Sequence, residues 1–143
     1  MTDFTPQDPY FETRVRENFS RQTIMHTIGA TMTRVEPGLV AIELPFRADL
    51  CQQNGFLHGG VVTMIADSAC GYAASTLIPA NQDVLAVEFK VNLLSPAVGE
   101  KLVAVGRVIR AGRTLTVCAA EVTAYSKDGH KVVAIMQGTV FQR

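Results

Sequence analysis

The fold of this 143-residue chain is decided by residues 59–79, which read GGVVTMIADSACGYAASTLIP. Nearly all side chains from Val61 to Ile78 are small or apolar, the one charge is Asp67, and Pro79 cannot continue a helix. This stretch therefore predicts one long helix over 61–78. A helix that is apolar almost all round is buried on most sides, so the rest of the chain is expected to surround it.

The segments on either side of this helix have the patterns of short helices and strands. Apolar positions at helical spacing predict one or two short surface helices within 9–26. Two β-rich runs follow, and Pro37-Gly38 between them predicts a hairpin of 28–36 with 38–46. Four further strand-like runs, which predict an antiparallel meander, lie near 83–95, 99–111, 113–126 and 131–142. The sum is an α+β unit in which one antiparallel sheet wraps one long helix.

Composition favours one compact unit and argues against several function classes. With 48% apolar residues, we expect a single domain over 1–143, with an N-terminal helical segment 1–27 and a core 28–143. Thirteen Lys and Arg balance thirteen Asp and Glu, so no general attraction to nucleic acid or anionic membranes is expected. No apolar leader or membrane-length segment is present, which predicts a soluble cytoplasmic protein. The three cysteines lack metal-ligand spacing; reduced thiols and no metal are expected.

Asp67 is the single charge within the predicted helix, and it needs a physical explanation. An ionised carboxylate in apolar surroundings costs several kcal/mol unless it is paired, and desolvation raises its pKa. Residues three, four or seven positions away form a face made largely of small side chains, which can admit a ligand: Gly60, Thr63, Met64, Gly71 and Ala74. The opposite face, expected to press against the sheet, holds Val62, Ile65, Ala66, Ala69, Tyr72 and Ala73. The alternative is that Asp67 faces solvent or pairs with an arginine across a subunit contact.

The start of the helix carries a second feature, Gly55-Phe56-Leu57-His58-Gly59-Gly60. Backbone N–H groups of a first helical turn have no partner within the helix, and the helix dipole adds about half a positive charge there. Such an end can hold an oxyanion or a polarised carbonyl, and the two glycines let a ligand approach the main chain. The alternative is a plain loop-to-helix turn in which His58 orients or caps the helix.

Four segments occur together in a fixed order: Asn54 to Gly60, Asp67 nine residues after His58, Ser95-Pro96-Ala97 with Gly99-Glu100, and Arg110 to Thr114. From about residue 28 to the end, this pattern resembles the PaaI-like branch of the hot-dog-fold acyl-CoA thioesterases, in the 4-hydroxybenzoyl-CoA thioesterase superfamily. The resemblance implies a hot-dog fold, homodimers with a continuous sheet that commonly pair into homotetramers, and active sites between subunits.

Carried over residue by residue, the resemblance implies catalytic roles for Asp67, Gly59, Gln52 and His58. Asp67 becomes the catalytic carboxylate, either as general base on water or as nucleophile, and Gly59 would offer its backbone N–H to the thioester carbonyl. Gln52 replaces a loop asparagine six residues before His58 and can still donate an amide N–H. On the strand after the helix, many relatives have a Ser or Thr near the nucleophilic water. This chain has Ala86 there, and Ser68 or Ser75 could substitute.

Further residues are expected to contact the substrate. Those near the reacting group are Asn54, Gly60, Ser68, Gly71 and Ala86. Arg110 and Arg113, together with Lys90, could meet the phosphates of CoA, although exposed basic residues at turns are mostly just solvated. Phe56, Leu57 and Tyr72 could line an acyl tunnel or belong to the core.

The resulting hypothesis is hydrolysis of an acyl-CoA thioester to a carboxylic acid and free CoA, with aryl-acetyl or medium-length acyl groups by family analogy. Thiolate is a good leaving group, so the lack of a Ser-His-Asp arrangement is no objection. Coenzyme A is part of the substrate, and no separate cofactor is expected. Two alternatives stay open. One is a non-catalytic acyl-CoA-binding hot-dog protein, which Ala86 favours, and the other is a hot-dog hydratase or dehydratase, for which only His58 is available.

Overall fold

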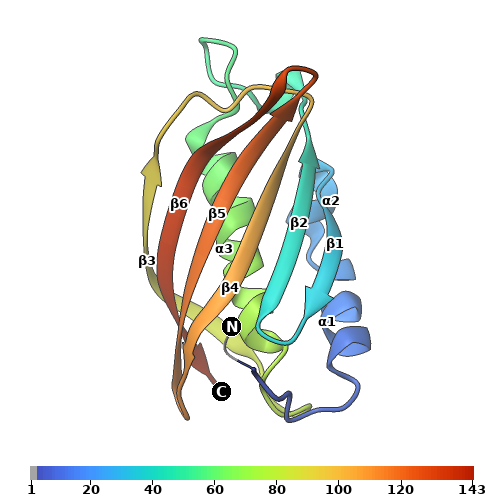
Figure 1. Ribbon diagram of the computed structural model, residues 1–143. Helices are drawn as coiled ribbons and strands as arrows, with labels where there is room; N and C mark the ends of the chain where they lie inside the picture. Colours follow the sequence, from blue (N-terminus) through green and yellow to red (C-terminus); the bar gives the residue numbers. More distant parts are fainter. Residues whose placement is uncertain (1–2) are drawn as a thin grey trace.

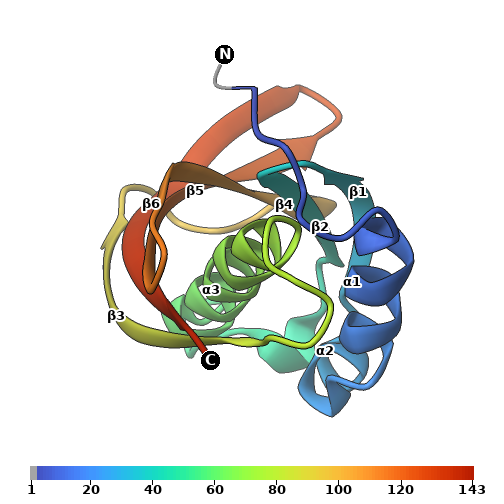
Figure 2. The same cartoon turned by 90° about the horizontal axis from the view of Figure 1, so that it is seen from below.

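The computed structural model describes residues 3–143 and contains one curled sheet with a long helix inside it (Figures 1 and 2). The helices in this range are α1 (Phe11–Ser20), α2 (Thr23–Ile28) and α3 (Gly59–Ser75), with a 3-10 turn at Ala48–Leu50. The strands are β1 (Thr31–Glu36), β2 (Leu39–Pro45), β3 (Val84–Leu93), β4 (Lys101–Ala111), β5 (Leu115–Ser126) and β6 (Gly129–Gln142). The predicted α+β architecture, one antiparallel sheet wrapped around one long helix, is confirmed. Across these residues, no helix is both long and apolar enough to cross a membrane.

The long helix α3 begins two residues before the predicted start of the helix and ends three residues before its predicted end. At its start, His58 Nδ1 accepts the N–H of Gly60 at 2.8 Å, and this cap allows both glycines to join the helix. At its end, the hydroxyl of Thr76 donates to the carbonyl of Ala73 at 2.7 Å. The side chain of Thr76 thus satisfies a terminal carbonyl, and the helix stops before Pro79 is reached.

Most of the face of α3 that was expected to press against the sheet is buried: Val62, Ile65, Ala66, Ala69 and Ala73. Strand β4 approaches this face so closely that a Cβ on Gly106 would overlap the backbone of Ala69. The prediction that Tyr72 belongs to the sheet-facing side is wrong. Its hydroxyl needs a hydrogen-bond partner, and it turns toward α1, where it donates to Asn18 Oδ1 at 3.0 Å.

The strand order is β1-β2-β4-β5-β6-β3, which differs from the predicted meander. Strands β4, β5 and β6 are consecutive neighbours as expected, but β3 pairs with β6, with Ala86 opposite Val140. The chain between β3 and β4 crosses the amino end of α3, where the N–H of Leu57 donates to the carbonyl of Ala97 at 2.9 Å. This crossing places β3 alone at one edge of the sheet (Figure 1).

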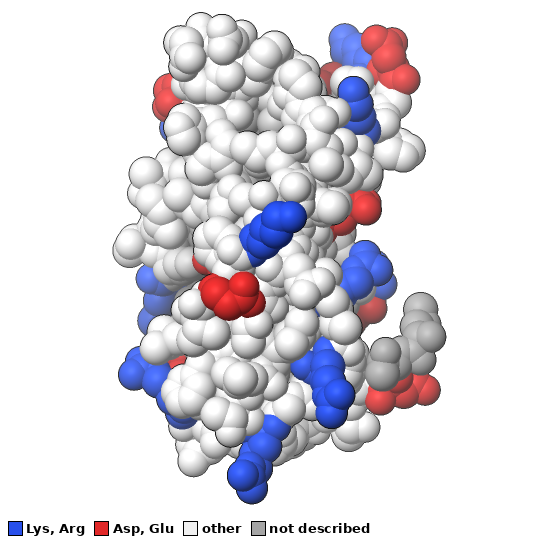
Figure 3. Space-filling view, turned by 90° about the vertical axis from the view of Figure 1, so that its left-hand side faces the viewer, with Lys and Arg blue, Asp and Glu red and all other residues white. Residues whose placement is uncertain are grey.

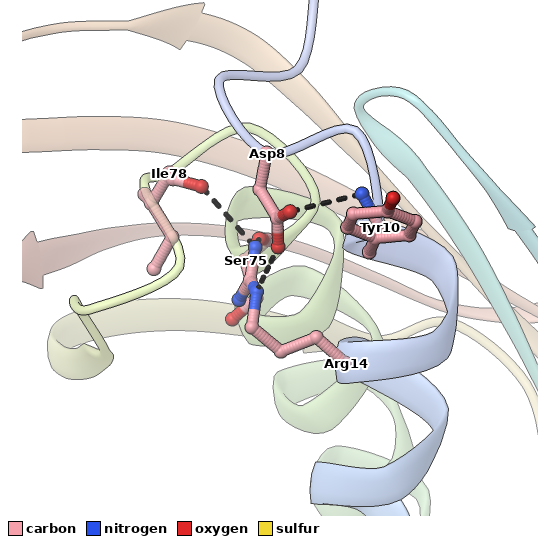
Figure 4. Close-up of polar contacts among 5 residues, drawn as sticks. All are labelled: Asp8, Tyr10, Arg14, Ser75 and Ile78. Carbon is pink, nitrogen blue, oxygen red and sulfur yellow. Dashed lines mark hydrogen bonds and ion pairs between the residues drawn. The ribbon is translucent and has the colours of Figure 1, made fainter.

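The N-terminal arm is tied to the carboxyl end of α3 by Arg14 (Figure 4). Its Nε lies 2.7 Å from Asp8 Oδ2, and its Nη2 donates to the carbonyl oxygens of Ser75 at 3.0 Å and Ile78 at 3.1 Å. The hydrogen bond from Arg14 holds the pKa of Asp8 below its ordinary value, and the N–H of Tyr10 adds to this effect. Because carbonyls at a helix end lack partners within the helix, this cation stabilises both segments.

Candidate active site

Asp67 lies midway along α3 and faces a pocket rather than the sheet. It is half-buried, and it lines a cavity of about 360 Å³ together with side chains from the N-terminal helices and the start of β3. In the described part of the chain no ion pair engages its carboxylate. Burial raises the pKa of this carboxyl above its ordinary value. Arg21 and Asp83 also line this pocket, but Asp67 is its partly desolvated acid without an ion pair among the described residues.

The N-terminal helices supply a wall of this pocket that the sequence analysis missed. Asn18 and Gln22 lie four residues apart and meet Tyr72 and Ser68, which are four residues apart on α3. The hydroxyl of Tyr72 donates to Asn18, and Gln22 Nε2 donates to Ser68 Oγ at 3.3 Å. Burial raises the pKa of Tyr72 to about 12, so the phenol remains a hydrogen-bond donor at neutral pH. The sequence offered one signal for this wall: the amide side chains of Asn18 and Gln22 interrupt the apolar positions of the helical segment predicted within 9–26.

Three residues that the sequence analysis assigned to substrate binding, Ser68, Gly71 and Ala86, line the same pocket as Asp67. A Cβ built on Gly71 would meet no atom within 4 Å, so the glycine leaves open space one turn beyond Asp67. Ser75 also borders the pocket, but its hydroxyl donates to the carbonyl of Gly71 at 3.0 Å.

The start of α3 borders a second cavity, of about 340 Å³, that includes Gln52, Phe56 and Gly59. The N–H of Gly60 is held by His58, whereas the backbone hydrogen bonds found in residues 3–143 include none from the N–H of Gly59. Gln52 Oε1 accepts the N–H of Asn54, which leaves its amide N–H₂ to donate. The structure thus shows His58 as a helix cap, and a catalytic role for it stays a prediction.

Asp67 and Gly59 line different cavities within one protomer. Eight residues of α3 separate them, which corresponds to about 12 Å along the helix axis. A single thioester carbonyl therefore cannot contact the acid and the free N–H of the same chain. No group of three His, Cys, Asp or Glu side chains suited to a metal ion occurs among the described residues.

The remaining predicted site residues lie apart from these two cavities. Asn54 is exposed on the loop before α3. Arg110 and Arg113 are exposed at or next to the turn between β4 and β5. This turn lies at the opposite end of the sheet from the start of α3 (Figure 1). Lys90 lines a different cavity, which it shares with charged side chains of β3, β4 and β5. Contacts of these cations with CoA stay a prediction.

Strand β3 is an unpaired edge with an apolar surface. Four of its side chains are about half exposed: Leu85 at 48%, Val87 at 56%, Phe89 at 44% and Leu93 at 57%. Figure 3 looks onto this side of the molecule and shows a mostly uncharged upper part, with acidic and basic side chains at mid-height. The other edge strand, β1, exposes mainly threonine and charged residues. An open sheet edge with exposed apolar side chains is a template for strand pairing.

Comparison with known proteins places this site in a family. The thioesterase superfamily model matches residues 54–132, which include the loop before α3, Asp67 and the strands up to β6. A solved thioesterase family protein from Silicibacter pomeroyi superposes with a TM-score of 0.91 and 42% identity, covering 92% of this chain and 97% of the other.

Two further similarities bear on the fold and on the chemistry. The PaaI protein of E. coli superposes with a TM-score of 0.82 at 18% identity over 93% of each chain, which shows a shared fold. A 1,4-dihydroxy-2-naphthoyl-CoA hydrolase of Listeria monocytogenes is 26% identical over 117 residues, which cover 82% of this chain and 93% of that protein. The resemblance drawn from the four sequence motifs is confirmed: the chain belongs to the thioesterase superfamily and has its hot-dog fold.

Proposed function

We propose that this protein hydrolyses acyl-CoA thioesters to a carboxylic acid and free CoA, with Asp67 as the catalytic carboxylate. The observation that carries the proposal is the half-buried carboxylate of Asp67, which lines a pocket without an ion-pair partner in the described residues. A carboxyl whose pKa is raised by burial is a stronger base than an ordinary carboxylate, which suits it to accept a proton from water during hydrolysis. The free thiols of the chain fit a reducing compartment, so we place the reaction in the cytoplasm.

In the proposed reaction, the oxygen of a water molecule attacks the thioester carbonyl carbon while Asp67 takes the proton. The C–S bond then breaks, its electron pair stays on sulfur, and the CoA thiolate takes the proton held by Asp67, which returns the carboxylate to its charged form. The N–H of Gly59 would donate to the carbonyl oxygen as negative charge develops there. One such donor is worth about 3 kcal/mol in comparable sites. Attack by the carboxylate of Asp67 itself is the alternative route.

A second copy of the chain would complete the site, because Asp67 and Gly59 of one protomer cannot meet the same carbonyl. Antiparallel pairing of two β3 strands would continue the sheet and set the two α3 helices side by side in opposite directions. Gly59 of the partner subunit would then approach Asp67. Each half-exposed apolar side chain of β3 would contribute about 1 kcal/mol when covered, since full burial is worth about 1.5–3 kcal/mol. By family analogy, such dimers would pair into homotetramers.

The two cavities suggest how the substrate is divided. The pocket of Asp67 would hold the acyl group, and the cavity at the start of α3 would hold the pantetheine arm. A volume of about 360 Å³ falls within the range of small-molecule pockets and suits an aryl-acetyl or medium-length acyl group. A relative named for an aromatic acyl-CoA supports the aryl class. Lys90, Arg110 and Arg113 remain proposed contacts for the CoA phosphates.

Thiol release from a panel of acyl-CoA substrates, from acetyl to decanoyl and including phenylacetyl, tests this function. Wild-type protein should turn over, and Asp67→Asn should lose at least about a hundredfold in kcat, as expected for a residue that handles the proton. Asp128→Asn, at the exposed turn between β5 and β6, is the matched control and should keep the wild-type rate. Binding of acyl-CoA by the wild type without any thiol release would instead establish a binding protein.

A further inference from the structure

The proposed hydrolysis requires a group that holds the attacking water, and Ala86 has no hydroxyl to do so. The side-chain hydroxyls of α3 and its cap can be compared one by one. Thr63 donates to the carbonyl of Gly59 at 2.7 Å, Ser75 to that of Gly71 at 3.0 Å, and Thr76 to that of Ala73 at 2.7 Å. Each of these hydrogens is already held by the backbone of the helix.

Ser68 is different, because its oxygen accepts a hydrogen bond instead. Gln22 Nε2 donates to Ser68 Oγ at 3.3 Å, and among the described residues no acceptor is found for the hydrogen of Ser68. The side chain of Ser68 is buried next to Asp67 in sequence, and both residues line the same pocket as Gln22. A hydroxyl that receives an N–H keeps its own hydrogen free for another partner.

Gln22 is held in place by its backbone hydrogen bonds, and one atom of its side-chain amide is left unpaired. It lies at the turn between α1 and α2, where its N–H donates to the carbonyl of Phe19 and its carbonyl accepts the N–H of Met25, both at 3.0 Å. Its Oε1 is buried, and within residues 3–143 it is the one buried side-chain polar atom without a hydrogen-bond partner. An unpaired buried acceptor destabilises the fold, so its presence here needs an explanation, and a role in catalysis is one.

We propose that Gln22 is a positioning residue for this hydrolysis: its amide occupies the oxygen of Ser68, which leaves the Ser68 hydrogen free to hold the attacking water beside Asp67. The water oxygen accepts from Ser68 and one water hydrogen points to the carboxylate of Asp67. During attack that proton moves to Asp67, the water oxygen bonds to the carbonyl carbon, and Ser68 stays protonated. This assignment rests on the proposed function, and it takes the general-base route rather than attack by the carboxylate.

Four variants measured by thiol release test the assignment: Ser68→Ala, Gln22→Met, the double variant and Ser20→Ala. Ser68→Ala should lower kcat about 10- to 100-fold with little change in KM, because only the attacking water is misplaced. Gln22→Met keeps the side-chain volume and should lower kcat by a smaller factor. The double variant should be no slower than Ser68→Ala, since Gln22 acts through Ser68. Ser20→Ala, on the exposed side of α1, removes a hydroxyl whose hydrogen is held by the carbonyl of Glu17 at 2.6 Å, and it should stay within about twofold of wild type.

Single-turnover hydrolysis in ¹⁸O-labelled water needs no change at Gln22 and tests the route directly. Label in the carboxylic acid from the first turnover supports a positioned water, whereas label in Asp67 instead overturns it. Wild-type kcat in Ser68→Ala, with Asp67→Asn inactive, would overturn the role of Ser68 and leave the proposed function standing. If Gln22→Met lowered kcat by the same factor in the wild type and in Ser68→Ala, the positioning role of Gln22 would be overturned. No thiol release by the wild type would overturn both proposals.

Discussion

Replacing Gly71 with leucine should shorten the acyl group that the protein accepts and, at the same time, stabilise the fold. Gly71 lies one turn after Asp67 on the pocket side of α3, and a Cβ at this position would meet no atom within 4 Å. We therefore expect a leucine side chain at this position to extend into the pocket. Because glycine is about 1 kcal/mol less favourable than alanine inside a helix and leucine is close to alanine, the free energy of unfolding should rise by roughly 0.5–1 kcal/mol.

The effect on specificity follows from the volume that leucine takes from the cavity of about 360 Å³. Leucine adds four carbon atoms, and each acyl methylene that loses its place forfeits about 0.8 kcal/mol of transfer free energy. A long acyl group should therefore lose up to about 3 kcal/mol, which is more than a hundredfold in kcat/KM. An acetyl group does not reach this part of the pocket and should lose little.

The assay is thiol release from acetyl-, butyryl-, octanoyl- and phenylacetyl-CoA, with thermal unfolding measured on the same samples. Gly71→Ala is the matched control: it gives the gain in helix stability but fills little of the pocket, so its acyl preference should remain close to wild type. A uniform loss across the substrates would show that the pocket of Asp67 does not hold the acyl group. A lower melting temperature for Gly71→Leu would show that the space is not open.

Three further predictions concern stability and assembly. Burial raises the folded-state pKa of Asp67, so its charged form destabilises the fold as pH rises above the ordinary pKa of 3.8. Asp67→Asn should therefore raise Tm at pH 7. A gain in Tm of the same size near pH 3, where the carboxyl is neutral, would refute this reasoning. Arg14→Met should lower Tm at pH 7 more than the control Arg34→Met, because the ion pair of Arg34 is exposed. The pKa of Asp8 is lowered in the folded state, so the difference in Tm between the two variants should shrink as pH falls through that lowered pKa. Equal losses of Tm at pH 7 would contradict the view that Arg14 ties the N-terminal arm to the end of α3. Phe89→Asp places a charge at the edge strand β3, and light scattering should then find monomers. These monomers should release no thiol, and an active monomer would disprove a site shared between subunits.

Local patterns were sufficient for the features of this chain that depend on neighbouring residues. The central helix follows from a continuous small and apolar run, and its burial follows from the same composition. Asp67 could be singled out because a charge in such a helix conflicts with burial unless it has a use or a partner. The β-rich runs were also found, and their boundaries shifted by only a few residues because caps and turns such as Gly29, with φ of 79°, end elements on local geometry.

Tertiary structure decided what covers each element and which residues share the pocket. The position of β3 beside β6 depends on pairing between strands that are distant in the sequence. The buried face of β5 carries small residues such as Thr116, Cys118 and Ala120, whereas the more apolar Leu115 is exposed.

The bonds from Gln22 to Ser68 and from Tyr72 to Asn18 join residues 46 and 54 positions apart, and no periodicity reports such contacts. A pattern within one segment records how much of that segment is buried. Which side chains surround Asp67 depends on how distant segments pack together, and only the folded chain specifies that.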